Sequence, residues 1–450
     1  MLDFKSWAEK QWPSSLFFDP RHHKRVVNIA LRVMKHPKAS IPGRFPLQKE
    51  VKGCYRFLNN KAVNHQMLQR EHYRNVLAEA ASAPGRVLFI QDGSELIYNN
   101  LKWTDLGPTA DSSGNGIMFH SCLAVKFADN QPQIIGLSGQ KAWIRKEKEQ
   151  GADPKAQEEK ESMVWQEMID QIGPVPENCK WTTVGDRGAD IFPFIESLPQ
   201  GWDCVVRSKH DRKILVNDMS VRLKKYVRAL PSMGTTTHFL RARNSFSRQV
   251  TLRVSWAEVD MLPPEAHKEK DPIKGSYVRV WCEEDPKIEW ILFTRSPITS
   301  FEEASEIVTI YKHRWLIEEY HKCLKTGCQI EKVQLRTADR LLVLFGMLGV
   351  IATQLLQLKG ISRVKPDEPA VKYVDKLSLA VLQNIYELKS PLTVKEFWRR
   401  VAMLAGFMGR KSDGNPGWQK IWEGWSQLRN MCRGVEIGRQ LNISDFEKIT

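Results

Sequence analysis

The chain has 450 residues, enough for about two to four domains and a substantial core. Lysine and arginine number 67 against 52 aspartate and glutamate residues, a net charge of +15, so nucleic acid is the expected partner. The N-terminus has no apolar signal core, which argues against secretion. The eight cysteines form no C-x-x-C pair, which argues against structural zinc, and the most apolar run (341–352) is shorter than a membrane span. Together these features predict a cytoplasmic protein.

Residues 1–65 are strongly basic and predict a helical DNA-binding domain. Asp19 can cap a helix that has Pro20 at its first position, and an apolar side follows along that helix. The cations outside the apolar side suit phosphate contacts, although a solvated helix face would have the same composition. The candidate DNA contacts here are Arg21, Lys24 and Arg25.

From about Val63 strands alternate with helices, which predicts an α/β core with a largely parallel sheet. The predicted strands are 87–90, 118–127, 133–145, 181–185 and 203–207, and the predicted helices are 157–172 and 191–198. The first strand ends in Asp92 and the fourth in Asp186. Ligand sites of open α/β sheets lie at the carboxyl ends of strands, so both acids are candidates for the site, although an acid after a strand is often only a turn former or helix cap.

Period-two alternation follows between about residues 215 and 296, in 251–257, 277–281 and 288–293. We interpret this β-rich block as an insertion and not as a separate domain. The loop ahead of it, 207–213, is the most concentrated basic loop near the expected site. A phosphate track is favoured over a solvated loop, and its candidate contacts are Arg207, Lys209, His210 and Arg212.

Ser300 and Glu303 form a capping-box pattern, which predicts a helix from about Phe301 to Gly327. At roughly 100° per residue, four polar side chains of this helix fall within about 60° of one another, and the apolar side chains gather on a different arc. The four are Tyr311, Arg314, Glu318 and Lys325.

This stripe presents a carboxylate between cations, and it selects Glu318 over the neighbouring Glu319, which lies about 100° away. An ordinary amphipathic helix with solvated charges would have the same period. His321 and Lys322 flank the stripe and are further candidates for DNA contacts.

Residues 361–450 predict a helical C-terminal domain. Trp418, Trp422 and Trp425 recur there at helical spacing. Core packing is the favoured interpretation of this tryptophan stripe, and a partner surface is the alternative.

The spacing Tyr311-x2-Arg314-x3-Glu318-x6-Lys325 resembles the Y-R-E-K signature of one family of bacterial insertion-sequence transposases. The resemblance covers nearly the whole chain. Further matching segments are Asp19-Pro-Arg21, Tyr55-Arg-Phe57, Asp186-Arg187, Val205-Val-Arg-Ser-Lys-His210, His313-Arg-Trp315, Gly406-Phe-Met408 and Trp422-Glu-Gly-Trp425.

The resemblance implies an RNase H-like catalytic domain at 66–360, interrupted by the β insertion, with its D-D-E triad at Asp92, Asp186 and Glu318. It also implies an end-binding domain at 1–65 and a helical C-terminal domain at 361–450 that contributes to a homodimer. Departures from the family pattern are His22 and His23, which stand in a stretch that is more arginine-rich in the relatives, and the weakly matching residues 361–405.

Phosphodiester cleavage needs an activated water, a stabilised leaving oxygen and relief of phosphate charge, and two Mg²⁺ ions can supply all three. Hard cations prefer carboxylate oxygens, so Asp92, Asp186 and Glu318 are the predicted ligands, and Mn²⁺ is expected to substitute. Arg314 and Lys325 would neutralise phosphate charge and Tyr311 would position the backbone.

The resemblance also matches Trp290 to a tryptophan that stacks on a base flipped out while a hairpin end forms. A buried strand position explains Trp290 equally well. The resulting hypothesis is a cut-and-paste transposase, associated with the bacterial nucleoid, that binds terminal inverted repeats and joins their 3′-hydroxyl ends to target DNA as a dimer.

Two alternatives remain. A structure-selective nuclease of the same fold could use similar carboxylates, but the long insertion and the complete Y-R-E-K stripe argue against it. A catalytically idle DNA-binding regulator is the other, and the presence of all three acids argues against that.

Overall fold

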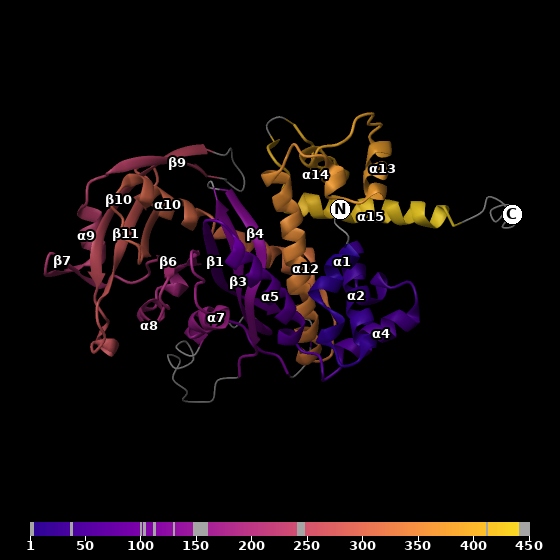
Figure 1. The fold of residues 1–450 in the computed structure, drawn as a ribbon, viewed down its shortest axis with the longest axis horizontal. Helices are drawn as coiled ribbons and strands as arrows, with labels where there is room; N and C mark the ends of the chain where they lie inside the picture. The colour runs from indigo at the N-terminus through magenta and orange to yellow at the C-terminus, as the bar shows by residue number, and fades with distance from the viewer. Residues whose placement is uncertain are drawn as a thin grey trace.

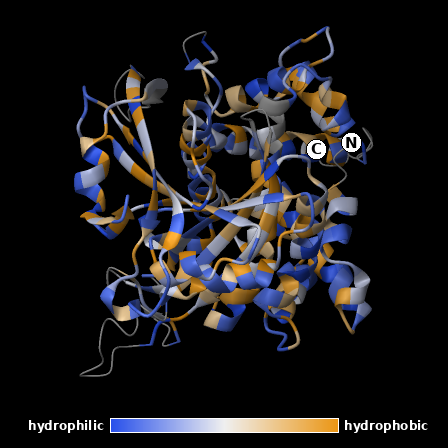
Figure 2. Cartoon of the chain, turned by 60° about the vertical axis from the view of Figure 1, so that its left-hand side comes forward, coloured by the Kyte–Doolittle hydropathy of each residue, from blue (hydrophilic) through white to orange (hydrophobic). Residues whose placement is uncertain are grey.

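The computed structural model describes residues 4–36, 39–99, 101, 105–110, 114–128, 131–146, 161–240, 248–410 and 413–440. A mixed β-sheet lies between two layers of helices, and further helices from both ends of the chain pack together beside it (Figure 1). Figure 2 shows hydrophobic segments gathered in the interior and hydrophilic ones on the outer helices.

The N-terminal segment is helical. Asp19 accepts a hydrogen bond from the backbone N–H of Arg21 and so caps α2, with Pro20 in the first helical turn as predicted. The apolar side of α2 is buried, and its exposed side carries the cations. The helices are α1 (Phe4–Gln11), α2 (Pro20–Lys35), α3 (Ile41–Arg44), α4 (Gln48–Leu58) and α5 (His65–Ser82).

Twelve described strands form one sheet in the order β2-β3-β1-β5-β6-β12-β11-β10-β7-β8, with β4 on β3 and β9 on β10. The first part contains β1 (Arg86–Ile97), β2 (Gly107–Pro108), β3 (Asn115–Ala128), β4 (Gln131–Trp143), β5 (Lys180–Gly185) and β6 (Trp202–Arg207). The β-rich block contains β7 (Lys213–Val216), β8 (Met219–Arg222), β9 (Gly234–Leu240), β10 (Arg248–Met261), β11 (Ile273–Trp281) and β12 (Glu289–Thr294). All eight predicted strands are present.

The expectation of a largely parallel sheet is wrong. Only β1 with β5 and β5 with β6 are parallel among the described pairs, and the others are antiparallel. The reason is that β1, β3 and β4 follow one another without an intervening helix, so neighbouring strands run in opposite directions. The β-rich block extends the same sheet, because β12 pairs with β6.

Alternate residues of β1 enter two different hydrophobic clusters. Leu88 and Ile90 pack on the face covered by α10 (Phe301–Lys312), α11 (Trp315–Lys322) and α12 (Ala338–Val364). Val87 and Phe89 pack on the opposite face against α7 (Val164–Ile172) and α8 (Phe192–Glu196). This strict alternation is the pattern of a strand buried on both faces. The predicted start of the 157–172 helix lies outside the described residues.

The helix predicted from Phe301 to Gly327 is interrupted. Its capping box forms as predicted, but α10 ends at Lys312, α11 begins at Trp315, and a π-helical turn occupies Cys323–Gly327. The ring of His313 donates from Nδ1 to the carbonyl oxygen of Thr309 at 2.7 Å. That carbonyl would otherwise accept the backbone N–H of His313, which instead donates to Ile310, so the side chain competes with the helix.

The apolar run near residue 341 belongs to α12, as predicted for a core helix. Within the described residues, Ala338–Gln357 is the one stretch with the length and hydropathy of a membrane span, and 83% of it is buried inside the fold. Short helices follow at α13 (Lys376–Ile385) and α14 (Val394–Leu404), and the long α15 spans Trp418–Gly438.

The core-packing interpretation of the tryptophan stripe is confirmed. Trp422 and Trp425 are buried, and the indole N–H of Trp422 donates to the carbonyl oxygen of Gly327 at 2.9 Å. The C-terminal helices are therefore attached to the end of the segment that carries Glu318.

Candidate active site

The three predicted acids come from three segments that converge on one face of the sheet. Asp186 directly follows β5, as predicted. Asp92 lies within β1 and not at its end, which corrects the prediction, because β1 continues against β3 as far as Ile97. Its parallel pairing with β5 nevertheless stops at Ile90, so Asp92 lies just beyond the parallel region. Glu318 lies in the first turn of α11, which packs on β1.

Arg314 links two of the acids. Its Nη1 lies 3.5 Å from Asp92 Oδ2, and its Nη2 donates to Glu318 Oε1. Asp92 and Arg314 are both mostly buried, whereas Glu318 is about half exposed. A single guanidinium therefore bridges carboxylates that are 226 positions apart in the chain (92 and 318).

Asp92 has a strongly raised pKa. The pKa of Asp92 is raised to about 7, mainly by burial and also by the negative charges of Asp186 and Glu318, with Arg314 opposing the shift. A raised pKa from neighbouring like charges means that the three carboxylates lie within mutual electrostatic range. Strongly perturbed acids of this kind are characteristic of functional sites.

Asp186 has a structural role as well as a candidate catalytic one. Its Oδ1 accepts the backbone N–H of Gly188 at 2.7 Å and caps the one-turn 3₁₀ helix Arg187–Ala189. Gly185, immediately before it, is required for close packing, because a Cβ there would lie 2.3 Å from the Cβ of Ala189. The helix-cap interpretation of Asp186 is thus correct, and it is compatible with a place in the acid cluster.

Tyr311 is buried beside Trp290, with ring centroids 5.5 Å apart in an edge-to-face arrangement. Burial raises the pKa of Tyr311, while the nearby guanidinium groups of Arg207 and Arg314 oppose that shift. Arg207 also donates to the carbonyl oxygen of Glu289 at 3.0 Å. Trp290 is half-buried on β12, so one aromatic pair and two arginines adjoin the acids.

The two lysines predicted on the acid-bearing helix differ in exposure. Lys322 ends α11 and is exposed to solvent. Lys325 lies in the π-helical turn and is half-buried.

Two candidate DNA contacts are wrong. His321 is buried with its ring edge-to-face against Phe119, and burial lowers its pKa to about 3, so it is a neutral core residue. The side chain of Arg212 is mostly buried and paired with Asp190 at 2.8 Å. Helical phase and local charge could not reveal either burial, because both result from packing against distant segments. His210 and Lys209 are exposed, as a DNA contact requires.

In the N-terminal segment, Arg21 and Lys24 are exposed, and Arg21 forms an ion pair with Asp19. Arg25 is half-buried and donates to the carbonyl oxygen of Gly53 at 3.2 Å, so it joins α2 to α4. Its candidate role as a DNA contact is weakened, because part of its hydrogen-bonding capacity is used inside the domain.

The chemistry of the acid cluster fits a divalent metal ion, since carboxylate oxygens are hard ligands and the charges of Asp186 and Glu318 add to burial in raising the pKa of Asp92. In the part of the chain that the structure describes, no three His, Cys, Asp or Glu side chains are arranged to hold an ion. Arg314 contacts both Asp92 and Glu318 and contributes one positive charge to the cluster of three acids.

Sequence reasoning missed Asp190. This side chain is buried four residues after Asp186, and it binds the basic loop 208–212 through several hydrogen bonds. The available signal was an acid between a strand and a short helix, which predicts only a cap.

Comparison with protein-family models gives two matches. The transposase DNA-binding model matches residues 4–63, and the transposase DDE domain model matches residues 153–355. Asp186 and Glu318 lie inside the second match and Asp92 lies before it. Among solved structures, the chain is similar to the piggyBac transposase synaptic complex with hairpin DNA, at 9% identity and a TM-score of 0.35, over 93% of this chain and 73% of that one. A likeness of this size does not bear on individual site residues.

Proposed function

Since the chain carries a transposase DNA-binding domain and a transposase DDE domain and is therefore a DNA transposase, we propose that it is a cut-and-paste enzyme of the Y-R-E-K insertion-sequence family. It binds terminal inverted repeats, cleaves the transposon ends through a hairpin intermediate, and joins the 3′-hydroxyl ends to target DNA. The catalytic domain is RNase H-like, with the helical segments 1–65 and 361–450 on either side.

The observation that carries this proposal is the electrostatic cluster of Asp92, Asp186 and Glu318. Burial and the charges of Asp186 and Glu318 together raise the pKa of Asp92 to about 7, although Arg314 pairs with both Asp92 and Glu318. Retaining a buried acid beside two other acids is unfavourable for folding and is explained by a catalytic role.

Asp92, Asp186 and Glu318 would hold two Mg²⁺ ions, for which Mn²⁺ would substitute. When bound, these ions supply an activated water or 3′-hydroxyl and stabilise the leaving oxygen. Arg314 and Lys325 contribute positive charge toward the phosphate, and Arg314 is well placed because it already lies between two of the acids. Tyr311 and Arg207 position the strand beside the cluster.

Trp290 would stack on a base extruded while the hairpin forms. Its edge-to-face contact with Tyr311 supports this role, because the pair fixes the orientation of an aromatic side chain next to the acids. Lys209, His210 and Lys322 would follow the DNA backbone, and the exposed Arg21 and Lys24 would contact phosphates of the terminal repeat. Two copies would act together on a pair of ends.

The test uses purified protein and duplexes taken from the DNA that flanks the reading frame. In Mg²⁺ the wild-type protein should nick these ends, form hairpins and join the ends to a plasmid, and Mn²⁺ should replace Mg²⁺. Asp92→Ala should bind the same ends with unchanged affinity and cut none of them. Cleavage without joining would identify a structure-selective nuclease, and binding without cleavage by the wild type would identify a regulator. Either result would refute the proposal.

A further inference from the structure

Asp190 holds the basic loop that follows β6. Its Oδ2 accepts the backbone N–H groups of Lys209 at 2.7 Å and His210 at 2.9 Å. Its Oδ1 accepts both Nε and Nη2 of Arg212, at 3.1 and 2.8 Å. The carboxylate is 1% exposed, so these charge-assisted bonds lie in a low-dielectric interior where they are strong.

The rest of the loop is fixed from other sides. The backbone N–H of Ser208 donates to the carbonyl oxygen of Ile291 at 2.8 Å, which joins the loop to β12. Asp211 accepts the backbone N–H of Lys224 at 2.8 Å, at the start of α9 (Leu223–Ala229). A loop with partners on three elements has little conformational freedom left, so any ligand it binds costs little additional ordering.

Lys209 is the cation that this loop presents. Because Asp190 occupies the backbone N–H groups of Lys209 and His210, only the side chains remain for an external anion. Both side chains are exposed. Burial lowers the pKa of His210 below its usual value, and the charges of Arg212, Lys209 and Lys224 add to this against the opposing effect of Asp190, so His210 is mostly neutral at pH 7. One positive charge, on Lys209, is therefore expected to meet a phosphate.

Asp190 also belongs to the segment that carries an acid of the active site. Asp186 caps the 3₁₀ turn Arg187–Ala189, and Asp190 ends it, with its backbone N–H donating to the carbonyl oxygen of Arg187. A five-residue segment thus has a candidate catalytic acid at one end and the anchor of a cationic loop at the other. The spacing between acid and cation is fixed by this segment and not by the length of a flexible loop.

We propose that Asp190 is a positioning residue that holds Lys209 against a DNA phosphate in register with Asp186. The inference rests on the proposed function, because it takes DNA as the ligand of the loop. The ion pair of Asp190 and Arg212 would thus have a role in DNA binding that a purely structural ion pair does not have.

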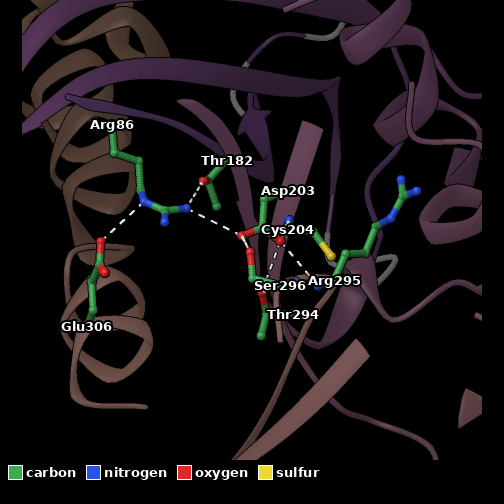
Figure 3. Close-up of polar contacts among 8 residues, drawn as sticks. All are labelled: Arg86, Thr182, Asp203, Cys204, Thr294, Arg295, Ser296 and Glu306. Atoms are coloured by element: carbon green, nitrogen blue, oxygen red, sulfur yellow. Dashed lines mark hydrogen bonds and ion pairs between the residues drawn. The ribbon is translucent and has the colours of Figure 1, made fainter. Parts of the chain in front are cut away.

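A structural ion pair elsewhere in the same sheet provides the matched control. Asp203, near the start of β6, is mostly buried and accepts Arg86, Ser296 and the backbone N–H of Arg295 (Figure 3). Like Asp190, it accepts several hydrogen bonds and is mostly shielded from solvent, but it lies at the amino end of β6, whereas the loop that Asp190 holds follows the carboxyl end of that strand. Asp203→Asn should therefore reproduce the loss of stability without the loss of a DNA contact.

The experiment measures binding of the full-length protein to a short DNA duplex of arbitrary sequence over a range of salt concentrations. Lys209→Ala should make the slope of log K against log salt shallower by about 0.9, the value for one lost phosphate contact. Asp190→Asn should give the same change, and the double variant should give no more than either single one. Asp203→Asn should lower the melting temperature and leave the slope unchanged.

An unchanged slope in folded Asp190→Asn, or a further reduction in the double variant, would overturn the inference. If Asp190→Asn does not fold, Lys209→Ala still decides, because its side chain is exposed and an unchanged slope would show that the loop meets no phosphate. Cleavage of flanking DNA by the wild-type protein is measured in parallel. If the wild-type protein cleaves this DNA but the slopes are unchanged, only the inference about Asp190 fails. If the wild-type protein does not cleave the DNA, the proposed function fails.

Discussion

The three strands β1, β5 and β6 run parallel, and the charged side chains at their amino ends are paired differently from those at their carboxyl ends. At the amino ends, Arg86 donates to Thr182 at 2.7 Å, and it pairs with Asp203 at 3.3 Å and Glu306 at 3.2 Å (Figure 3). At the carboxyl ends, Asp92, Asp186 and Glu318 have only Arg314 as a described ion-pair partner, shared between two of them. The amino-end network compensates its charges, whereas the carboxyl-end cluster leaves excess negative charge.

Burial alone does not explain this difference, because both clusters are mostly buried and contain the same residue types. What differs is the number of donors for each carboxylate. Asp203 accepts hydrogen bonds from Arg86, Thr294 and Ser296, among others, and no comparable set surrounds Asp92 among the residues that the structure describes. A fold that stabilises one end and tolerates repulsion at the other retains the second for function.

Replacing one carboxylate at each end of the strands by an amide should give the largest difference between a catalytic acid and a structural one. Asp92→Asn should abolish cleavage and raise the melting temperature by a few degrees. Its folded pKa of about 7 exceeds the unfolded value, so its ionised form costs stability above pH 7, and this cost disappears below the unfolded pKa. Asp203→Asn should cleave DNA and melt at a lower temperature. Cleavage assays and thermal denaturation at pH 8 test both, and a destabilised Asp92→Asn would contradict the comparison.

The two bridging arginines form a second matched pair. Arg314→Met should lower the cleavage rate at saturating DNA by about 10²-fold to 10³-fold, as expected for a group that stabilises transition-state charge. Arg86→Met should leave that rate unchanged and cost about 2 kcal/mol of unfolding free energy, since it removes a donor from buried acids. Single-turnover kinetics and urea denaturation measure the two effects. Equal rate losses in both variants would show that Arg314 acts only through stability.

The pH dependence of metal binding sharpens the contrast further. Below pH 7 the Asp92 carboxyl is protonated in the metal-free protein, and a metal ion must displace that proton. The Mg²⁺ dissociation constant should therefore rise as pH falls through 7, approaching about tenfold per pH unit. Isothermal calorimetry between pH 6 and pH 8.5 measures it (roughly the range spanning the shifted pKa). A dissociation constant that does not change across this range would exclude Asp92 as the ligand that titrates.

Local patterns predicted much of this architecture. The strands, the Asp19 cap and the capping box at Ser300 each depend on neighbouring residues, and all are present. The gathering of Asp92, Asp186 and Glu318 was predicted from strand ends and helical phase, and the charges of Asp186 and Glu318 contribute to the raised pKa of Asp92. The break at His313 was not predictable from period, because it depends on one ring that competes for a carbonyl oxygen.

The remaining errors concern contacts between distant segments. Sequence analysis could not show that Arg212 faces inward, because its partner Asp190 lies 22 positions earlier. His321 lies three residues from Glu318, yet it packs on Phe119 of β3. Charge and phase indicate which residues could face DNA, and tertiary packing decides which of them do.

Stabilisation by Mg²⁺ is the most direct test of where the ion binds. A ligand that binds only the folded state stabilises it by about 2.7 kcal/mol at one hundred times its dissociation constant. Mg²⁺ should thus raise the melting temperature of the wild-type protein by a few degrees at pH 8. Asp186→Asn should lose this increase, because the ion loses a ligand at the carboxyl ends of the strands. Asp203→Asn should retain the full increase in melting temperature, since its carboxylate belongs to the compensated network at the amino ends. Loss of the increase in both variants would mean that the ion does not distinguish the two ends of the strands.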